Sequence, residues 1–395
     1  MIISRELCVK CKGRLYCGLK YCPLYARFSG LRLTRDQLEG SNIDVFVGRY
    51  NYPNVNFGII NVPEIDSKTA DIFQNNKFWL NQGFSIDQIL SMRSNTVYNY
   101  KKQDVKNVKR DLLQEMGLSI KPIYLSVYLK NRIDISLKSF KLLDPFGGRV
   151  KFEKIELQDT PEIPQKVDKL LNESSEEAVI KLRQHFDENY IRKVFSVGAL
   201  GISKKLVPTR WSITAVDDIL GKDIMKKIKE YEVIVNYKLF FGSLFGNYFL
   251  VLLIPSGFMY ELFEMYTEKK ELKEPEPEHD YELFFGRKEY AKITAGGYYA
   301  SRLGVLEYLN SNKIQAGVVV FRFITPEYKF PLGVWVVREA VRKAMSHKIR
   351  EFFQLKEALQ YILEFSKRNF LLDLSNVLRT SQVLIVHQQR KISSY

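Results

Sequence analysis

All four cysteines of this chain fall within its first 22 residues, at Cys8, Cys11, Cys17 and Cys22. Four thiolates in so short a segment can bind one metal ion tetrahedrally, and metal binding then supplies the folding energy that such a segment cannot obtain from a core of its own. The spacing therefore predicts a metal site. Zinc is favoured because the chain has no further cysteine for a second cluster or a redox partner. An iron–sulfur cluster is the alternative, because a Cys-Pro pair such as the one at Cys22 also occurs in iron–sulfur motifs.

The first 35 residues are also strongly basic. They hold eight lysine or arginine residues against the single acid Glu6, which leaves a charge of +7 out of the chain's +15. Lys10, Lys12, Arg14 and Lys20 lie within the cysteine segment, and tyrosines are interleaved with them. Cationic and aromatic side chains on a metal-bound loop suit phosphate contacts and base stacking. We therefore expect nucleic-acid binding here; the alternative is a structural cap with solvated lysines.

Composition indicates a globular protein. The chain has 395 residues, 46% of them hydrophobic, which suggests two or three domains with packed cores. The most apolar stretch, residues 233–255, is interrupted by glycines and polar residues, so we expect a buried β-hairpin there and no membrane span. The net charge of +15 makes an anionic polymer the expected partner. No targeting segment is recognisable, so a cytoplasmic location is expected.

The hydrophobic patterns predict an α+β fold, with a mixed sheet core and packed helices, a small N-terminal four-cysteine metal knuckle and a helical C-terminal region. A charged, proline-containing stretch at 268–282 indicates a linker or an exposed excursion, with a boundary near residue 275. The expected divisions are a zinc-binding basic module at 1–35, a core domain at 36–270, a C-terminal domain at 283–380 and a tail at 381–395. Strands are expected at 44–47, 57–62, 123–129, 133–137, 233–239 and 248–254. Helices are expected at 85–92, 105–116, 176–185, 215–220, 224–230 and 297–310, with two more within 337–370.

Two internal segments carry residues suited to phosphate chemistry. Arg49 and Tyr50 lie on a loop between two expected strands, where an arginine flanked by aromatic residues can hold a phosphate or a stacked base. A plain hairpin turn is the alternative. Further along, Arg210 precedes the adjacent acids Asp217 and Asp218. Neighbouring helical residues point about 100° apart, so these acids do not naturally bind one metal, and a helix capped at its start by Ser212 or Thr214 would explain them structurally.

A third segment, residues 294–302, runs from two glycines into an expected helix with Arg302 one turn inside it. Exposed backbone amides at a helix start attract anions, and Arg302 could add charge. The pattern is neither a Walker A motif nor a complete dinucleotide fingerprint. It therefore indicates phosphate binding only weakly.

The last seven residues contain Gln389, Ile392 and Tyr395 in the order Q-x-x-aliphatic-x-x-aromatic. This is the layout of a peptide that binds a sliding clamp. One helical turn would place Ile392 and Tyr395 on one side for a hydrophobic pocket, with Gln389 hydrogen-bonded nearby. The sequence therefore predicts a clamp-binding tail.

Long segments of the chain resemble the archaeal Nre family of DNA repair proteins. The resemblance rests on the four-cysteine segment and on four further stretches: FVGRYNYPNVNFG at 46–58, LVPTRWSITAVDD at 206–218, GGYYASRLGVLEYL at 296–309 and QAGVVVFRFITPEYKFPLGVWVVREAVRKAM at 315–345. It implies a role in DNA repair, a four-cysteine zinc finger with Cys8, Cys11, Cys17 and Cys22 as ligands, and association with the sliding clamp PCNA through residues 389–395. Two departures are Asn51, where a glycine is common, and a tail with one aromatic residue instead of two.

Three hypotheses follow. The leading one is a zinc-containing, DNA-binding repair factor recruited to the clamp. The second is an enzyme acting on DNA or a nucleotide, with Asp217 and Asp218 as candidate catalytic residues in a phosphate pocket that also includes Arg49, Arg210 and Arg302. The third is an adaptor without a nucleic-acid surface. A histidine-based hydrolase is disfavoured, because none of the four histidines adjoins a nucleophile motif.

Overall fold

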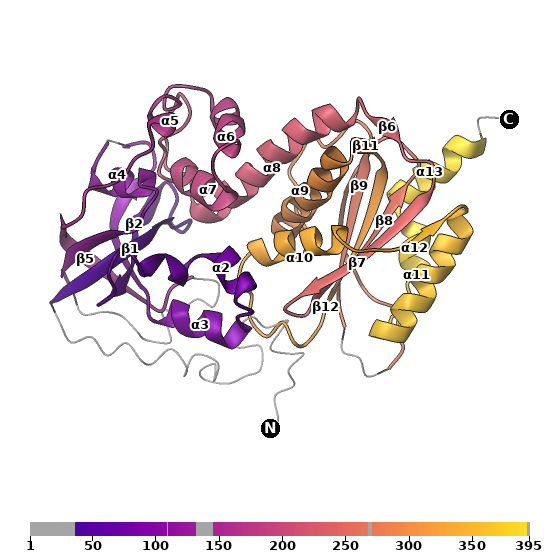
Figure 1. The fold of residues 1–395 in the computed structure, drawn as a ribbon, viewed down its shortest axis with the longest axis horizontal. Coiled ribbons are helices and arrows are strands. Elements are labelled where there is room, and N and C mark those ends of the chain that lie inside the picture. Colours follow the sequence, from indigo (N-terminus) through magenta and orange to yellow (C-terminus); the bar gives the residue numbers. More distant parts are fainter. Residues whose placement is uncertain (1–35, 109, 132–144, 268–270, 393–395) are drawn as a thin grey trace. The chain divides into compact units, whose positions relative to one another are not determined.

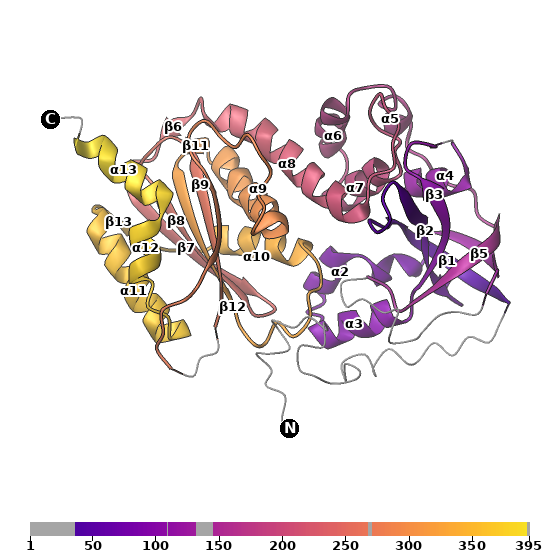
Figure 2. The same ribbon diagram turned by 180° about the vertical axis from the view of Figure 1, so that it is seen from behind.

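The computed structural model describes residues 36–108, 110–131, 145–267 and 271–392, and Figures 1 and 2 show it from two sides. Helices and strands alternate in an α+β fold, as the sequence predicted. The chain forms two compact units, and the break between them falls at residues 219 and 220. We call residues 36–219 the barrel unit and residues 220–392 the sheet unit. The predicted four-cysteine knuckle, with its ligands and its lysines, lies outside the described residues.

Five strands of the barrel unit close into a barrel in the order β1-β2-β3-β5-β4. They are β1 (Gln37–Val47), β2 (Asn54–Pro63), β3 (Val97–Asp104), β4 (Ile123–Leu129) and β5 (Gly148–Leu157). The pair β3–β5 is parallel and the other pairs are antiparallel. The first half of β1 pairs with β4, and β2 pairs from Gly40 onward, so β1 closes the barrel. Gly40 has φ +153°, and a Cβ there would lie 2.1 Å from the carbonyl oxygen of Val62, so only glycine fits.

Most helices of the barrel unit begin at a polar residue that caps them. Side chains of Asn75, Ser85, Asp111, Ser174 and Asp187 each accept a hydrogen bond from a backbone N–H in the first turn of the next helix. The helices are the 3₁₀ helix η2 (Ala70–Phe73), α2 (Asn76–Asn81), α3 (Ile86–Ser94), α4 (Leu112–Leu118), α5 (Gln165–Asp168), α6 (Ser175–Arg183), α7 (Glu188–Ser196) and α8 (Thr209–Ile228). Because the chain passes from one unit to the next within α8, its first half belongs to the barrel unit.

The sheet unit is built on a six-stranded sheet in the order β10-β9-β12-β8-β7-β13. Its strands are β7 (Tyr237–Leu244), β8 (Asn247–Ile254), β9 (Met259–Tyr266), β10 (Glu278–Glu282), β12 (Gly317–Ile324) and β13 (Lys348–Phe352), and β6 (Glu232–Val233) pairs with β11 (Ile314–Gln315) in a separate ladder. Its helices are α9 (Ala295–Ser311), α10 (Trp335–Met345), α11 (Leu355–Phe370), α12 (Ser375–Thr380) and α13 (Gln382–Ile392). Every residue of the central strand β12 is buried.

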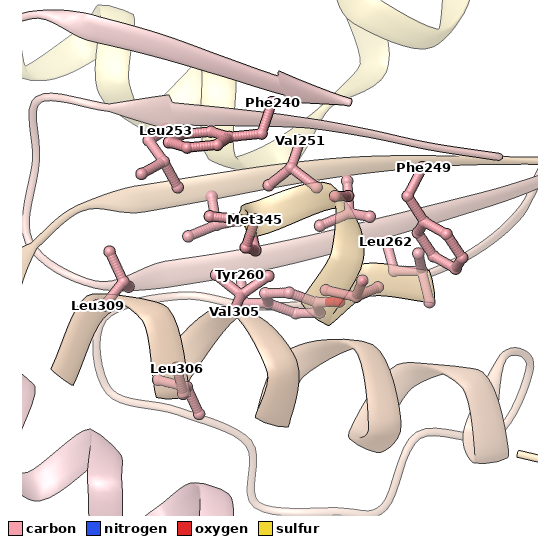
Figure 3. Close-up of a cluster of buried hydrophobic side chains, with 14 of the residues drawn as sticks. Phe240, Phe249, Val251, Leu253, Tyr260, Leu262, Val305, Leu306, Leu309 and Met345 are labelled. Atoms are coloured by element: carbon pink, nitrogen blue, oxygen red, sulfur yellow. The ribbon is translucent and has the colours of Figure 1, made fainter. Parts of the chain in front are cut away.

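Helices cover both faces of this sheet. On one face, Phe240, Val251 and Tyr260 of the sheet pack with Val305 and Leu309 of α9 (Figure 3). On the other face, side chains of β7, β8, β9 and β12 pack against α11, α12 and α13. Alternate residues along a strand point to opposite faces, which explains why neighbours in β8 belong to different clusters. The continuous apolar runs of β8 and β12 follow from this double burial.

Several elements match their predicted ranges. The strand β4 matches residue for residue, and β7 and β8 form the hairpin predicted for residues 233–255. No helix in the described ranges is both long and apolar enough to cross a membrane. The charged stretch at 268–282 ends in β10, which pairs with β9 in the same sheet, and the break between the two compact units lies at residues 219 and 220 and not near residue 275. The strand predicted at 133–137 lies outside the described residues.

Other predictions were wrong in their boundaries. The two helices predicted at 215–220 and 224–230 are one helix, α8, and Ser212 lies inside its first turns and does not cap it. The helix predicted at 105–116 begins only at Leu112, because Asp111 caps it. The segment 337–370 does form two helices, as predicted, but a strand, β13, separates them and extends the sheet.

A buried lysine in the barrel unit gives its stability a distinctive pH dependence. Lys193 of α7 donates a hydrogen bond to the carbonyl oxygen of Ser119 at 2.6 Å. Burial lowers the pKa of Lys193 to about 8, with partial opposition from the charge of Asp44. The unfolded chain keeps the ordinary, higher pKa of lysine, so between these two values it binds more protons than the folded chain. Stability therefore rises with pH across that window.

We predict that replacing Lys193 by methionine removes this rise. Between pH 8 and pH 10 the free energy of unfolding of the parent protein should increase by about 2 kcal/mol relative to that of K193M, because the unfolded chain releases the proton that the folded chain has already lost. Urea denaturation at several pH values measures the difference. The exposed Lys77→Met is the matched control and should follow the parent profile. Parallel profiles for the parent and K193M would contradict the prediction.

Candidate functional site

The loop between β1 and β2 projects aromatic rings into solvent beside an arginine. Tyr50 and Tyr52 are about half exposed, at 53% and 51%, on either side of Asn51, which has φ +61°. The guanidinium of Arg49 lies 5.2 Å from the centre of the Tyr50 ring, and its Nη2 donates to the Tyr50 hydroxyl at 3.5 Å. The plain-hairpin alternative therefore does not describe the loop fully, because its side chains form a cationic and aromatic surface.

The start of α8 lies against this loop. The backbone N–H of Val47, at the end of β1, donates to the Thr209 hydroxyl at 2.9 Å. The rings of Tyr52 and Trp211 lie 5.3 Å apart between centroids, and Trp211 is 45% exposed. Arg210 is also exposed. We call Arg49, Tyr50, Tyr52, Arg210 and Trp211 the loop–helix cluster. The two sequence segments that we singled out separately thus meet at one surface.

Hydrogen bonds hold both ends of the loop. Gly48 donates its N–H to the carbonyl oxygen of Asn56 at 2.8 Å, and Val105 donates to the carbonyl oxygen of Pro53 at 3.0 Å. The hydroxyl of Tyr98, on β3, donates to the carbonyl oxygens of Phe46 and Asn56 at 3.1 and 2.9 Å. The loop is therefore fixed at its base while its rings remain exposed. A site of this kind can stack planar groups and attract anions without a large ordering cost.

The remaining candidates of the enzyme hypothesis lie elsewhere. Asp217 and Asp218 are buried, at 1% and 3% exposure, two helical turns beyond Arg210 on α8. Arg302 is buried in the sheet unit, where it donates to both carboxylate oxygens of Glu282 at 2.9 and 3.1 Å. Both hydrogen bonds come from Nη1, and an arginine in such a buried ion pair is already neutralised. The structure therefore brings the loop of Arg49 and Tyr50 together with the start of α8 at Thr209 and Trp211, whereas Arg302 is paired inside the sheet unit.

The start of α9, which the sequence suggested as a binding site for an external anion, binds the carboxylate of Asp280 instead. One carboxylate oxygen of Asp280 accepts hydrogen bonds from the N–H groups of Ile293 and Thr294, at 3.0 and 2.7 Å, just before α9. It also accepts from the Thr294 hydroxyl at 3.0 Å. A carboxylate at a helix N-terminus interacts favourably with the helix dipole. Nothing in the sequence around Asp280 indicated this pairing, because it depends on how β10 lies beside α9.

The C-terminal helix is anchored by a second buried acid. The carboxylate of Glu261, on β9, accepts hydrogen bonds from the N–H groups of Gln382 and Val383, at 2.9 and 3.1 Å, and from the Ser381 hydroxyl. His279 lies 2.6 Å from the same carboxylate. α13 therefore starts at a fixed point on the sheet. Its last turns contain the exposed Gln389 and end at Ile392, whereas Tyr395 lies outside the described residues.

Within the described ranges, no group of three or more histidine, cysteine, aspartate or glutamate side chains could hold a metal ion. The four cysteines predicted as ligands lie outside those ranges. The metal site at the four cysteines therefore stays a prediction from the sequence.

Comparison with known proteins identifies the family. Residues 16–271 match the family model described as Archaeal Nre, N-terminal, and residues 282–395 match Archaeal Nre, C-terminal. The chain is 36% identical to DNA repair protein NreA and 34% identical to DNA repair protein NreB, both of Archaeoglobus fulgidus, and each match covers about nine tenths of both chains. It is 32% identical to DNA repair protein NreA of Haloferax volcanii over 82% of both chains. No solved structure matches it. The chain belongs to the archaeal Nre family.

Proposed function

We propose that this protein is a DNA repair factor that binds DNA through the loop–helix cluster of its barrel unit. Its relatives are named DNA repair proteins, which supports the repair role. The four-cysteine segment contributes a structural zinc site on a basic leader, and the C-terminal tail binds the sliding clamp PCNA.

The topology of the barrel is the observation that carries this proposal. Five strands in the order β1-β2-β3-β5-β4, with α4 between β3 and β4, correspond to the arrangement of the oligonucleotide-binding fold. In that fold, the loop between the first two strands is one of those that contact the oligonucleotide. Here the same loop carries Arg49, Tyr50 and Tyr52. Topology and side-chain chemistry therefore point to the same ligand at the same place.

The arginines and the aromatic rings of the cluster would contact different parts of the DNA. Arg49 and Arg210 attract the phosphates, in a chain whose net charge is +15. The exposed faces of Tyr50, Tyr52 and Trp211 offer surfaces on which bases stack, an interaction that tolerates any base sequence. The cluster therefore suits DNA binding without base-specific readout.

Replacing Trp211 by alanine should weaken DNA binding about 5- to 100-fold, because base–aromatic stacking contributes roughly 1–3 kcal/mol per base. Fluorescence anisotropy with labelled oligonucleotides measures the affinity. Ile202→Ala is the matched control, since Ile202 is an apolar residue of the same unit that is 85% exposed and is not part of the loop–helix cluster. Thermal unfolding of both variants checks that the fold is intact. Parent-like affinity in a folded W211A protein would contradict the proposal.

The proposed zinc site can be tested by measuring the zinc bound to the protein before and after a cysteine is replaced. The purified protein should contain about one zinc per chain, because the four thiolates form one tetrahedral site. Cys11→Ser should lower both zinc content and DNA affinity, whereas the control Lys12→Ala should lower DNA affinity alone. Elemental analysis measures the metal. Iron together with a brown chromophore would indicate the iron–sulfur alternative, and a metal-free active protein would contradict both.

The clamp-binding role predicts that removing residues 389–395 lowers the affinity for PCNA at least tenfold, by about 1.4 kcal/mol or more. Isothermal titration calorimetry measures this affinity. The double variant Ser393→Ala, Ser394→Ala is the control, because it leaves Gln389, Ile392 and Tyr395 in place. Equal affinity of the truncated and parent chains would exclude the tail as the clamp-binding element.

A further inference from the structure

The loop between β10 and α9, residues 283–294, presents large apolar side chains to solvent. Phe285 is 96% exposed, Ile293 61% and Tyr290 54%. Exposed apolar residues that gather in one short segment commonly mark a binding surface. The loop belongs to the sheet unit, whereas the loop–helix cluster belongs to the barrel unit.

The side chain of Arg287 links several parts of this loop through hydrogen bonds. Arg287 donates to the carbonyl oxygens of Tyr281 and Glu289, at 2.6 and 3.1 Å, and to the carboxylate of Asp280 at 3.1 Å. The same carboxylate fixes the end of the loop through the N–H groups at the start of α9. The residues on either side of Arg287 are thereby held in one compact turn.

Two further contacts fix the sides of the loop. Lys229, at the end of α8, donates to the carbonyl oxygen of Phe284 at 2.7 Å, and its ammonium lies 4.8 Å from the centre of the Phe284 ring. Ala291 donates its N–H to the Tyr299 hydroxyl at 2.9 Å. Because the backbone is ordered in advance, Phe285 can bind a partner without the cost of ordering a flexible loop.

The charges of the loop indicate what the rings bind. Between residues 283 and 294 there are three basic residues, Arg287, Lys288 and Lys292, and one acid, Glu289. Lys288 is exposed three positions after Phe285, whereas Lys292, also exposed, is already paired with Glu289 at 2.7 Å. Aromatic rings interleaved with lysines suit a polyanion that also carries planar groups. Lysine is depleted at protein–protein interfaces relative to the rest of the surface, so its presence among these rings favours a nucleic acid over a protein partner.

We propose that this loop is a second DNA-binding site, in which unpaired bases stack on Phe285 and Tyr290 while Lys288 contacts a phosphate. The proposal rests on the proposed function, because it assumes that the protein acts on DNA. Single strands are the expected ligand, because a base within a duplex is already stacked on both faces and offers its ring only after unpairing.

Titration of the full chain with single-stranded and duplex oligonucleotides tests the proposal. Phe285→Ala should weaken single-strand binding about 5- to 100-fold, the effect of losing one stacked base. Phe353→Ala is the matched control, since Phe353 is 83% exposed in the same unit but outside this loop. It should leave the affinity unchanged. Phe285→Trp should retain the affinity, and single strands should quench its fluorescence more strongly than that of the parent protein, whose three tryptophans include Trp211, whereas duplex should quench both to the same extent.

The outcomes separate this inference from the proposed function. If W211A loses DNA binding while F285A binds normally and F285W is quenched no more than the parent protein, the loop is not a DNA site and the barrel proposal stands. An apolar protein partner would then be the alternative occupant. If F285A loses binding and W211A does not, the loop is the DNA site and the barrel proposal falls. Extra quenching of F285W over the parent protein that is equal with duplex and single strands would overturn the choice of unpaired bases.

Discussion

The closure of the barrel by β1 determines where the candidate site lies. One strand pairs with β4 along its first half and with β2 along its second half, and it can do so because Gly40 allows a backbone approach that any Cβ would block. The end of this strand then fixes the position of the next loop. Val47, the last residue of β1, donates its backbone N–H to Thr209, so the start of α8 is held beside that loop. The loop–helix cluster is therefore a consequence of strand pairing, and its rings are placed by backbone contacts.

Acidic residues in the sheet unit bind internal partners, and this affects where external anions can bind. Asp280 accepts from the backbone before α9, Glu261 accepts from the backbone at the start of α13, and Glu282 pairs with the buried Arg302. Each of these carboxylates is buried and neutralises a positive group or a helix N-terminus. An external phosphate therefore cannot bind at α9 in the way that the glycines of its first turn suggested. An anionic ligand would therefore meet positive charge at side chains such as the partly exposed Arg49 and the exposed Lys288 and not at this helix start.

The sequence predicted local elements better than contacts between them. β4 and the β7–β8 hairpin were predicted because β-branched and aromatic runs between polar turns are local signals. The strand β13 was missed because its five residues contain three charged side chains and gain stability by pairing with the edge of β7. Arg49 and Arg210 were each recognised by residue type. Their shared surface was not predictable, because it depends on the register of β1 and on a hydrogen bond between residues 162 positions apart.

The loop–helix cluster and the 283–294 loop have the same arrangement of side chains, and this arrangement affects the entropy cost of binding DNA. In each, exposed rings adjoin cationic side chains, while hydrogen bonds from buried or backbone groups fix the ends of the segment. Flexible basic segments lose conformational freedom when they bind a polyanion, and that loss reduces their affinity. A fixed loop loses little conformational entropy on binding, so less of the stacking energy of each ring is offset in the binding free energy. Such surfaces favour a ligand that adapts its own shape, and a single strand with rotatable, unpaired bases adapts far more readily than a duplex.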